Sequence, residues 1–73
     1  SASPSKQLLL DDGNVELRAD VRDKAYNPLP AATVEARILG PSGMAAMVPL
    51  TPDANQAGMF TARWDAPKAG SYI

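Results

Sequence analysis

The sequence contains no cysteine and no histidine, and only four of its 73 residues are aromatic. It therefore has no disulfide, no zinc site of the usual kind, no thiol nucleophile and no imidazole base for Ser42 or Ser71. Seven basic and eight acidic residues leave a net charge of −1, which gives no electrostatic case for binding nucleic acid. No apolar run approaches the roughly 18 residues of a membrane span. We expect a non-catalytic protein without metal or cofactor.

The apolar residues that are present are mostly small. They make up 45% of the chain, but 13 of them are alanine, and Val, Ile, Leu and Phe together number 14. So few large apolar residues would suggest disorder if the net charge were high, and here it is low. A single small folded domain with a thin core is the expected result.

Apolar and polar residues alternate with a period of two in three separate segments, 14–23, 33–38 and 60–65. This period places the apolar residues on one face of a strand, whereas a helix would scatter them around its circumference. The three segments are therefore predicted to be half-buried β-strands.

Three shorter strands are predicted at 8–10, 47–50 and 71–73. In the second of these, Pro49 is expected to face outward and to lie at a sheet edge, because proline cannot donate a hydrogen bond to a ladder. Clusters of glycine, proline, asparagine and aspartate separate the predicted strands, at 11–14, 27–30, 40–43, 52–58 and 66–70. This spacing is typical of an all-β sandwich.

The alternation also predicts which side chains form the core. The main set is Val15, Leu17, Val21, Val34, Ile38, Phe60, Trp64 and Tyr72. The same phase adds further inward residues at Leu8, Leu10, Ala19, Ala36, Val48, Leu50 and Ala62. Small alanines facing the two large aromatic rings would let the sheets interdigitate.

The charged residues have ordinary structural explanations. Arginines at 18, 22, 37 and 63 alternate with core positions, and their expected partners are Glu16, Asp20, Glu35 and Asp65. Exposed pairs of this kind contribute about 0–1 kcal/mol each. The aspartates near the turns lack the ligand spacing of a calcium loop, and turn formation explains them better.

Tyr26 is the one aromatic residue expected to be exposed, because it lies in a turn. Together with Asp53 and Asn55 of the 52–58 loop it forms a candidate contact loop. Sugar-binding modules stack several rings on their ligand, and a single ring makes a poor platform. Polysaccharide or other ligand binding is therefore the alternative function rather than the leading one.

Five segments in order, 15–23, 27–36, 40–43, 58–64 and 66–72, follow a known pattern. The chain resembles the bacterial immunoglobulin-like modules, including macroglobulin-like ones, of large exported or membrane-anchored proteins. This resemblance implies an immunoglobulin-like β-sandwich over residues 7–73, with residues 1–6 as a linker or boundary segment. It also implies a location outside the cytoplasm, in the periplasm or at the cell surface.

In that family, the Gly-Ser-Tyr motif at 70–72 opens a strand that runs on for several residues before a final strand. The sandwich is therefore expected to lack its C-terminal strand or strands, which leaves an unpaired sheet edge. The resemblance implies a non-catalytic structural or interaction module, either a spacer or a protein–protein contact domain. Its expected partners are neighbouring domains of a parent chain and a second copy joined by edge pairing or strand exchange. Contact with a membrane is expected only through the parent protein.

Overall fold

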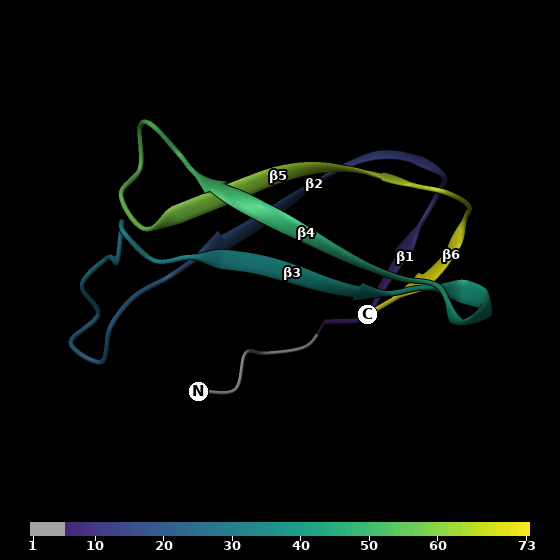
Figure 1. The fold of residues 1–73 in the computed structure, drawn as a ribbon, viewed down its shortest axis with the longest axis horizontal. Coiled ribbons are helices and arrows are strands. Elements are labelled where there is room, and N and C mark those ends of the chain that lie inside the picture. The colour runs from purple at the N-terminus through teal and green to yellow at the C-terminus, as the bar shows by residue number, and fades with distance from the viewer. Residues whose placement is uncertain (1–5) are drawn as a thin grey trace.

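The computed structural model describes residues 6–73, so the predicted linker, apart from Lys6, lies outside the described residues. This part of the chain is all-β, with two antiparallel sheets and no α-helix (Figure 1). The elements in order are β1 (Leu8–Leu10), β2 (Gly13–Asp20), β3 (Val34–Leu39), the 3-10 turn η1 (Pro41–Gly43), β4 (Ala45–Pro52), β5 (Met59–Ala66) and β6 (Gly70–Tyr72).

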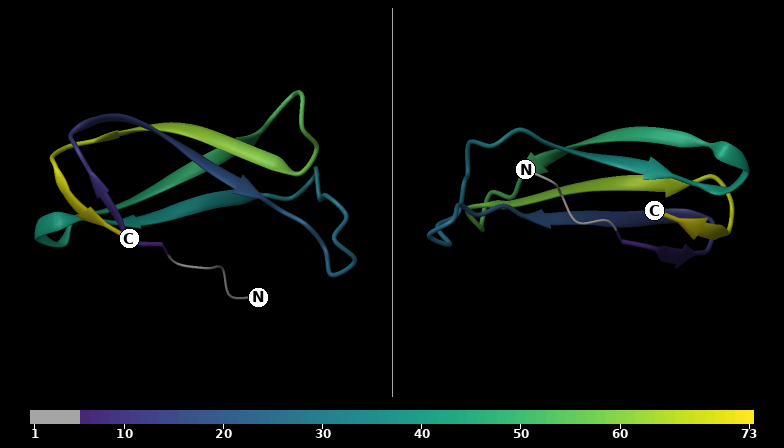
Figure 2. Two further views of the ribbon diagram at one scale, coloured as in Figure 1. Left: turned by 180° about the vertical axis from the view of Figure 1, so that it is seen from behind. Right: turned by 90° about the horizontal axis from the view of Figure 1, so that it is seen from below.

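One long two-stranded ribbon runs through both sheets. β2 pairs with β5 over its whole length, from Gly13 opposite Ala66 to Asp20 opposite Met59. The same two chain segments bend at 11–12 and 67–69 and pair again as β1 and β6. The β1–β6 ribbon therefore turns away from the four-stranded sheet, whose order is β2-β5-β4-β3 (Figure 2).

A pair of backbone hydrogen bonds joins the two sheets. Leu39, at the end of β3, donates to the carbonyl of Ile73 and accepts from its N–H, both at 2.8 Å. The strands therefore follow one another in the order β1-β6-β3-β4-β5-β2 around a curled half-barrel. Within residues 6–73, β1, β2 and the first part of β3 have no neighbouring strand on their outer sides.

The core lies on the concave side of this half-barrel and is thin. Ile38, Val48, Ala66 and Tyr72 form a buried cluster, and Phe60 is only 1% exposed. The other members of the predicted main core set are half-buried: Val15, Leu17, Val21, Val34 and Trp64. Leu8 lies opposite the buried Tyr72, on the inward face as predicted, but it is 40% exposed because it belongs to the terminal strand β1.

One predicted strand boundary and one predicted edge position also change. The predicted strand 14–23 ends at Asp20, because Val21 and Asp23 form backbone hydrogen bonds with Leu29 and Asn27 instead. Pro49 is exposed, but β4 is an interior strand rather than an edge. β4 accommodates this proline because its ladder with β5 includes only Thr51 and Pro52. No residue of β5 pairs with Pro49, so the hydrogen bond that proline cannot donate is not needed there.

Candidate functional site

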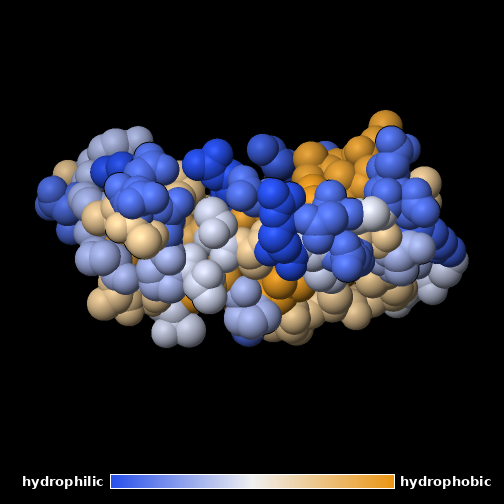
Figure 3. All heavy atoms as spheres, turned by 90° about the horizontal axis from the view of Figure 1, so that it is seen from above, coloured by the Kyte–Doolittle hydropathy of each residue, from blue (hydrophilic) through white to orange (hydrophobic). Residues whose placement is uncertain are grey.

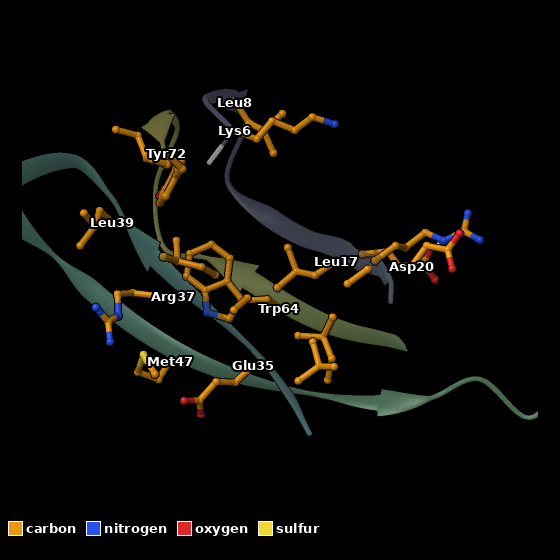
Figure 4. A pocket seen from close by; sticks show the side chains of 18 of the residues that line it. Lys6, Leu8, Leu17, Asp20, Glu35, Arg37, Leu39, Met47, Trp64 and Tyr72 are labelled. Atoms are coloured by element: carbon orange, nitrogen blue, oxygen red, sulfur yellow. The ribbon is translucent and has the colours of Figure 1, made fainter. Parts of the chain in front are cut away.

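An open groove of about 1410 Å³ follows the concave side of the half-barrel between β2 and β3. Its apolar lining includes Leu10, Leu17, Val34, Trp64 and Tyr72 (Figure 4). Charged side chains of the two flanking strands, among them Asp20, Glu35 and Arg37, lie along its rim. The groove is therefore an uncovered part of the core.

Trp64 lies in the phase expected for a core residue, yet it is only half-buried. Its ring meets the buried ring of Tyr72 in a T-shaped contact. The Tyr72 hydroxyl donates a hydrogen bond to the backbone carbonyl of Lys68, so the one polar atom of this buried side chain has a partner. Trp64 is held by this neighbour on one side, while part of its surface is exposed.

The outer edge of β2 carries backbone groups that no other described strand pairs. The backbone N–H of Val21 donates to the carbonyl of Gly58, which lies on the β5 side of β2. Because backbone groups alternate in direction along an antiparallel strand, those of Glu16, Arg18 and Asp20 point away from β5. β2 is also the last strand of its sheet. One wall of the groove is thus a free strand edge.

The outer edge of β3 forms the other wall. Pro49 lies opposite Glu35 and has no N–H to donate to it, so these two residues are not a hydrogen-bonded pair. The hydrogen-bonded pairs between β3 and β4 are therefore those of Val34, Ala36 and Ile38. The backbone groups of Glu35 and Arg37 therefore face outward, in phase with Leu39, which bonds to Ile73. A strand that continued the Leu39–Ile73 pair would lie along this edge.

Ion pairs cover the outer face of β2. The Nε atom of Arg18 lies 3.9 Å from Glu16, and that of Arg22 lies 3.2 Å from Asp20. Both pairs are exposed and therefore contribute little to folding. Charged edges of this kind oppose indiscriminate pairing with other strands.

Several further apolar side chains are exposed. Leu9 is 87% exposed, and Leu39, Met47 and Ile73 are about half exposed. In Figure 3, apolar atoms gather mainly toward the end of the molecule that carries β1 and β6, whereas hydrophilic atoms cover much of the opposite end.

The predicted contact residue Tyr26 lies at the other end and is 75% exposed. The guanidinium carbon of Arg22 lies 4.7 Å from the centroid of the Tyr26 ring, and the guanidinium also donates a hydrogen bond to the Tyr26 carbonyl. One carboxylate oxygen of Asp23 accepts hydrogen bonds from Ala25 and Asn27 and fixes the turn. Arg22 thus occupies one face of the ring.

Asp53 and Asn55 belong to a neighbouring loop at the same end of the molecule (Figure 1). The Asp53 carboxylate accepts a hydrogen bond from the backbone N–H of Asn55 at 2.7 Å. The fold thus brings the two predicted contact loops to one end, but Asp53 and Tyr26 each make their interactions within their own loop. The sequence did not predict the groove. Its one visible signal was the alternating charge of residues 16–22, which ion pairing between neighbouring side chains also explains.

Among residues 6–73, no group of three acidic side chains is placed to hold a metal ion. No helix in this range has the length and apolar character of a membrane span. No family model matches the sequence, and neither a curated protein nor a solved structure matches it significantly.

Proposed function

We propose that this protein is a non-catalytic interaction module that binds an extended polypeptide segment as an additional β-strand. The observation that carries the proposal is the apolar groove whose two walls are free strand edges, at β2 and β3. A free edge offers backbone donors and acceptors to a peptide, and alternate side chains of the peptide can then enter the groove.

The finer fold assignment belongs to the same proposal. An immunoglobulin-like sandwich without its C-terminal strand or strands would present an open position beside β3, where Ile73 already pairs with Leu39. The two antiparallel sheets are compatible with this assignment, and the sequence resemblance supports it. The same resemblance supports a role as a spacer or contact domain within a larger extracytoplasmic bacterial protein, with neighbouring domains as partners.

The half-buried indole of Trp64 provides the readout for a direct test. Synthetic eight-residue peptides in which valine alternates with threonine are titrated into the protein, and Trp64 emission is followed. We expect saturable binding with a blue shift, because a bound strand removes water from the groove. A peptide of eight prolines should not bind, since it has no backbone N–H to donate to a ladder. Unchanged Trp64 emission with every peptide would overturn the proposal.

A matched pair of variants locates the binding. Leu17→Asn places an amide in the groove wall and should abolish the shift, whereas Leu9→Asn changes an 87% exposed side chain outside the groove and should retain it. Cooperative urea unfolding of both variants serves as the folding control. Equal binding by the two variants would contradict groove binding. Titration with soluble oligosaccharides tests the polysaccharide alternative; a response that Tyr26→Ala abolishes would favour that alternative.

A further inference from the structure

The outer edge of β2 carries charges of alternating sign at every second position: Glu16, Arg18, Asp20 and, just beyond the strand, Arg22. This order is self-complementary when two copies run antiparallel about a two-fold axis at Ala19. Arg18 then lies opposite Asp20 of the second copy, and Glu16 lies opposite Arg22 of the second copy. All four charges of each strand meet a charge of opposite sign.

We propose that a second copy of this chain docks on the free edge of β2, antiparallel and with its two-fold axis at Ala19. The proposal rests on the proposed function, because it names a partner for one of the two edges that flank the groove. The pairing would join two four-stranded sheets into one continuous sheet across the two-fold axis.

The backbone geometry fits this register. The outward backbone groups of β2 belong to Arg18, Asp20 and their alternate neighbours, so Arg18 and Asp20 of the second copy form a hydrogen-bonded pair. Ala19 then faces its own copy as a non-hydrogen-bonded pair, where the Cα atoms approach to about 4.5 Å. The small alanine side chain suits this close approach.

The apolar face of β2 gives the docking a hydrophobic contribution. In the same register, Leu17 lies opposite Val21 of the second copy. Both residues line the groove and are half-buried in the single chain, so a second strand beside them would remove further apolar surface from water. The new contact would thus extend the groove wall.

Neighbouring registers fit less well. A two-fold axis at Arg18 would place this residue against itself. An axis at Leu17 would pair Glu16 with Arg18 but would set Asn14 against Asp20. The β3 edge carries only Glu35 and Arg37, because Leu39 is already bonded to Ile73. The register at Ala19 therefore has the largest number of complementary pairs.

The test measures the association of charge-reversed variants by analytical ultracentrifugation at low salt. Arg18→Asp alone sets carboxylates against carboxylates across the two-fold axis, and Asp20→Arg alone sets arginines against arginines. Each single variant should dimerise at least about tenfold more weakly than the unmodified chain, because like charges directly opposite each other are destabilising. The double variant carrying both substitutions should dimerise again.

Mixing the two single variants gives the sharpest result, since each then supplies the charges that the other lacks. We expect a heterodimer from two chains that do not pair with themselves. Arg37→Asp on the β3 edge is the matched control and should leave dimerisation unchanged. Urea unfolding of each variant, recorded below the dimerisation range, confirms that the variants are folded.

Three outcomes would overturn the proposal. One is an unmodified chain that stays monomeric up to millimolar concentration. Another is a dimer that Arg37→Asp weakens while Arg18→Asp does not, which would place the contact on β3. The third is a dimer that Asp20→Arg leaves intact, which would assign the register at Leu17. Peptide binding read from Trp64 can succeed in each case, so failure of this inference is distinguishable from failure of the proposed function.

Discussion

The ring of Tyr72 on β6 meets the ring of Trp64 on β5 edge to face, with centroids 5.6 Å apart and ring planes 80° apart. The two residues lie on either side of the bend at 67–69, so their contact holds the β1–β6 ribbon against the four-stranded sheet. Aromatic pairs of this geometry contribute about 0.5–1.5 kcal/mol beyond the area they bury. The bend, and with it one end of the groove, depends on this contact.

The two large rings of β5 should differ in their contribution to stability. Phe60 is fully buried, and Phe60→Ala should lower the free energy of unfolding by about 3–5 kcal/mol. Trp64→Ala should cost less, about 2–3 kcal/mol, because part of the indole is already in contact with water. Urea unfolding followed by circular dichroism measures both values. A larger loss for Trp64→Ala would mean that the groove is covered in solution.

Tyr72→Phe should destabilise the bend without emptying the core. The substitution removes the hydroxyl that donates to the Lys68 carbonyl and leaves this part-buried acceptor without its partner. The expected loss is about 1–2 kcal/mol in the free energy of unfolding. Tyr26→Phe is the control, because its ring is 75% exposed, and it should change stability by less than about 0.5 kcal/mol. Equal effects of the two substitutions would contradict a role for the Tyr72 hydroxyl in holding the bend.

Alanine substitutions at two glycines with positive φ allow the cost of backbone strain to be distinguished from the cost of steric crowding. Gly13 (φ 117°) has open space where a Cβ atom would lie, whereas at Gly58 (φ 84°) a Cβ would come within 2.7 Å of the Pro28 Cβ. Alanine is strained at both positions, but only at Gly58 must the loop at 27–29 also move. Gly58→Ala should therefore cost about 1–3 kcal/mol more than Gly13→Ala, the usual range for overpacking. Thermal melts of the two variants measure the difference, and similar melting temperatures would show that this loop yields freely.

Much of the local structure could be predicted from the sequence. Strands form at each of the six predicted segments, because alternating patterns and turn residues act over short distances. The predictions that failed concern what covers a residue. Leu8 follows the pattern of an inward residue, but no further strand of the described residues lies beyond β1 to cover it. Pro49 sits in an interior strand, because β4 and β5 pair only at one end.

The candidate site was predicted less completely, for a related reason. The exposure of Tyr26 was predictable from its turn, but its contact with Arg22 depends on a left-handed backbone at φ 67°. The sequence resemblance led us to expect an unpaired sheet edge near the C-terminal strand. It did not indicate the free edge at β2, since strand order depends on pairing between segments far apart in the chain.

The sequence by itself determined the phase of each strand: which side chains face inward, and where the chain turns. That information is local, because a period of two needs only a few neighbouring residues. Only the tertiary structure decided how deeply each inward side chain is buried. Burial depends on distant partners, such as the pairing of Leu39 with Ile73 that joins the two sheets and the bend that brings Tyr72 onto Trp64. The groove exists because those partners cover one end of the inward face and leave the space between β2 and β3 open.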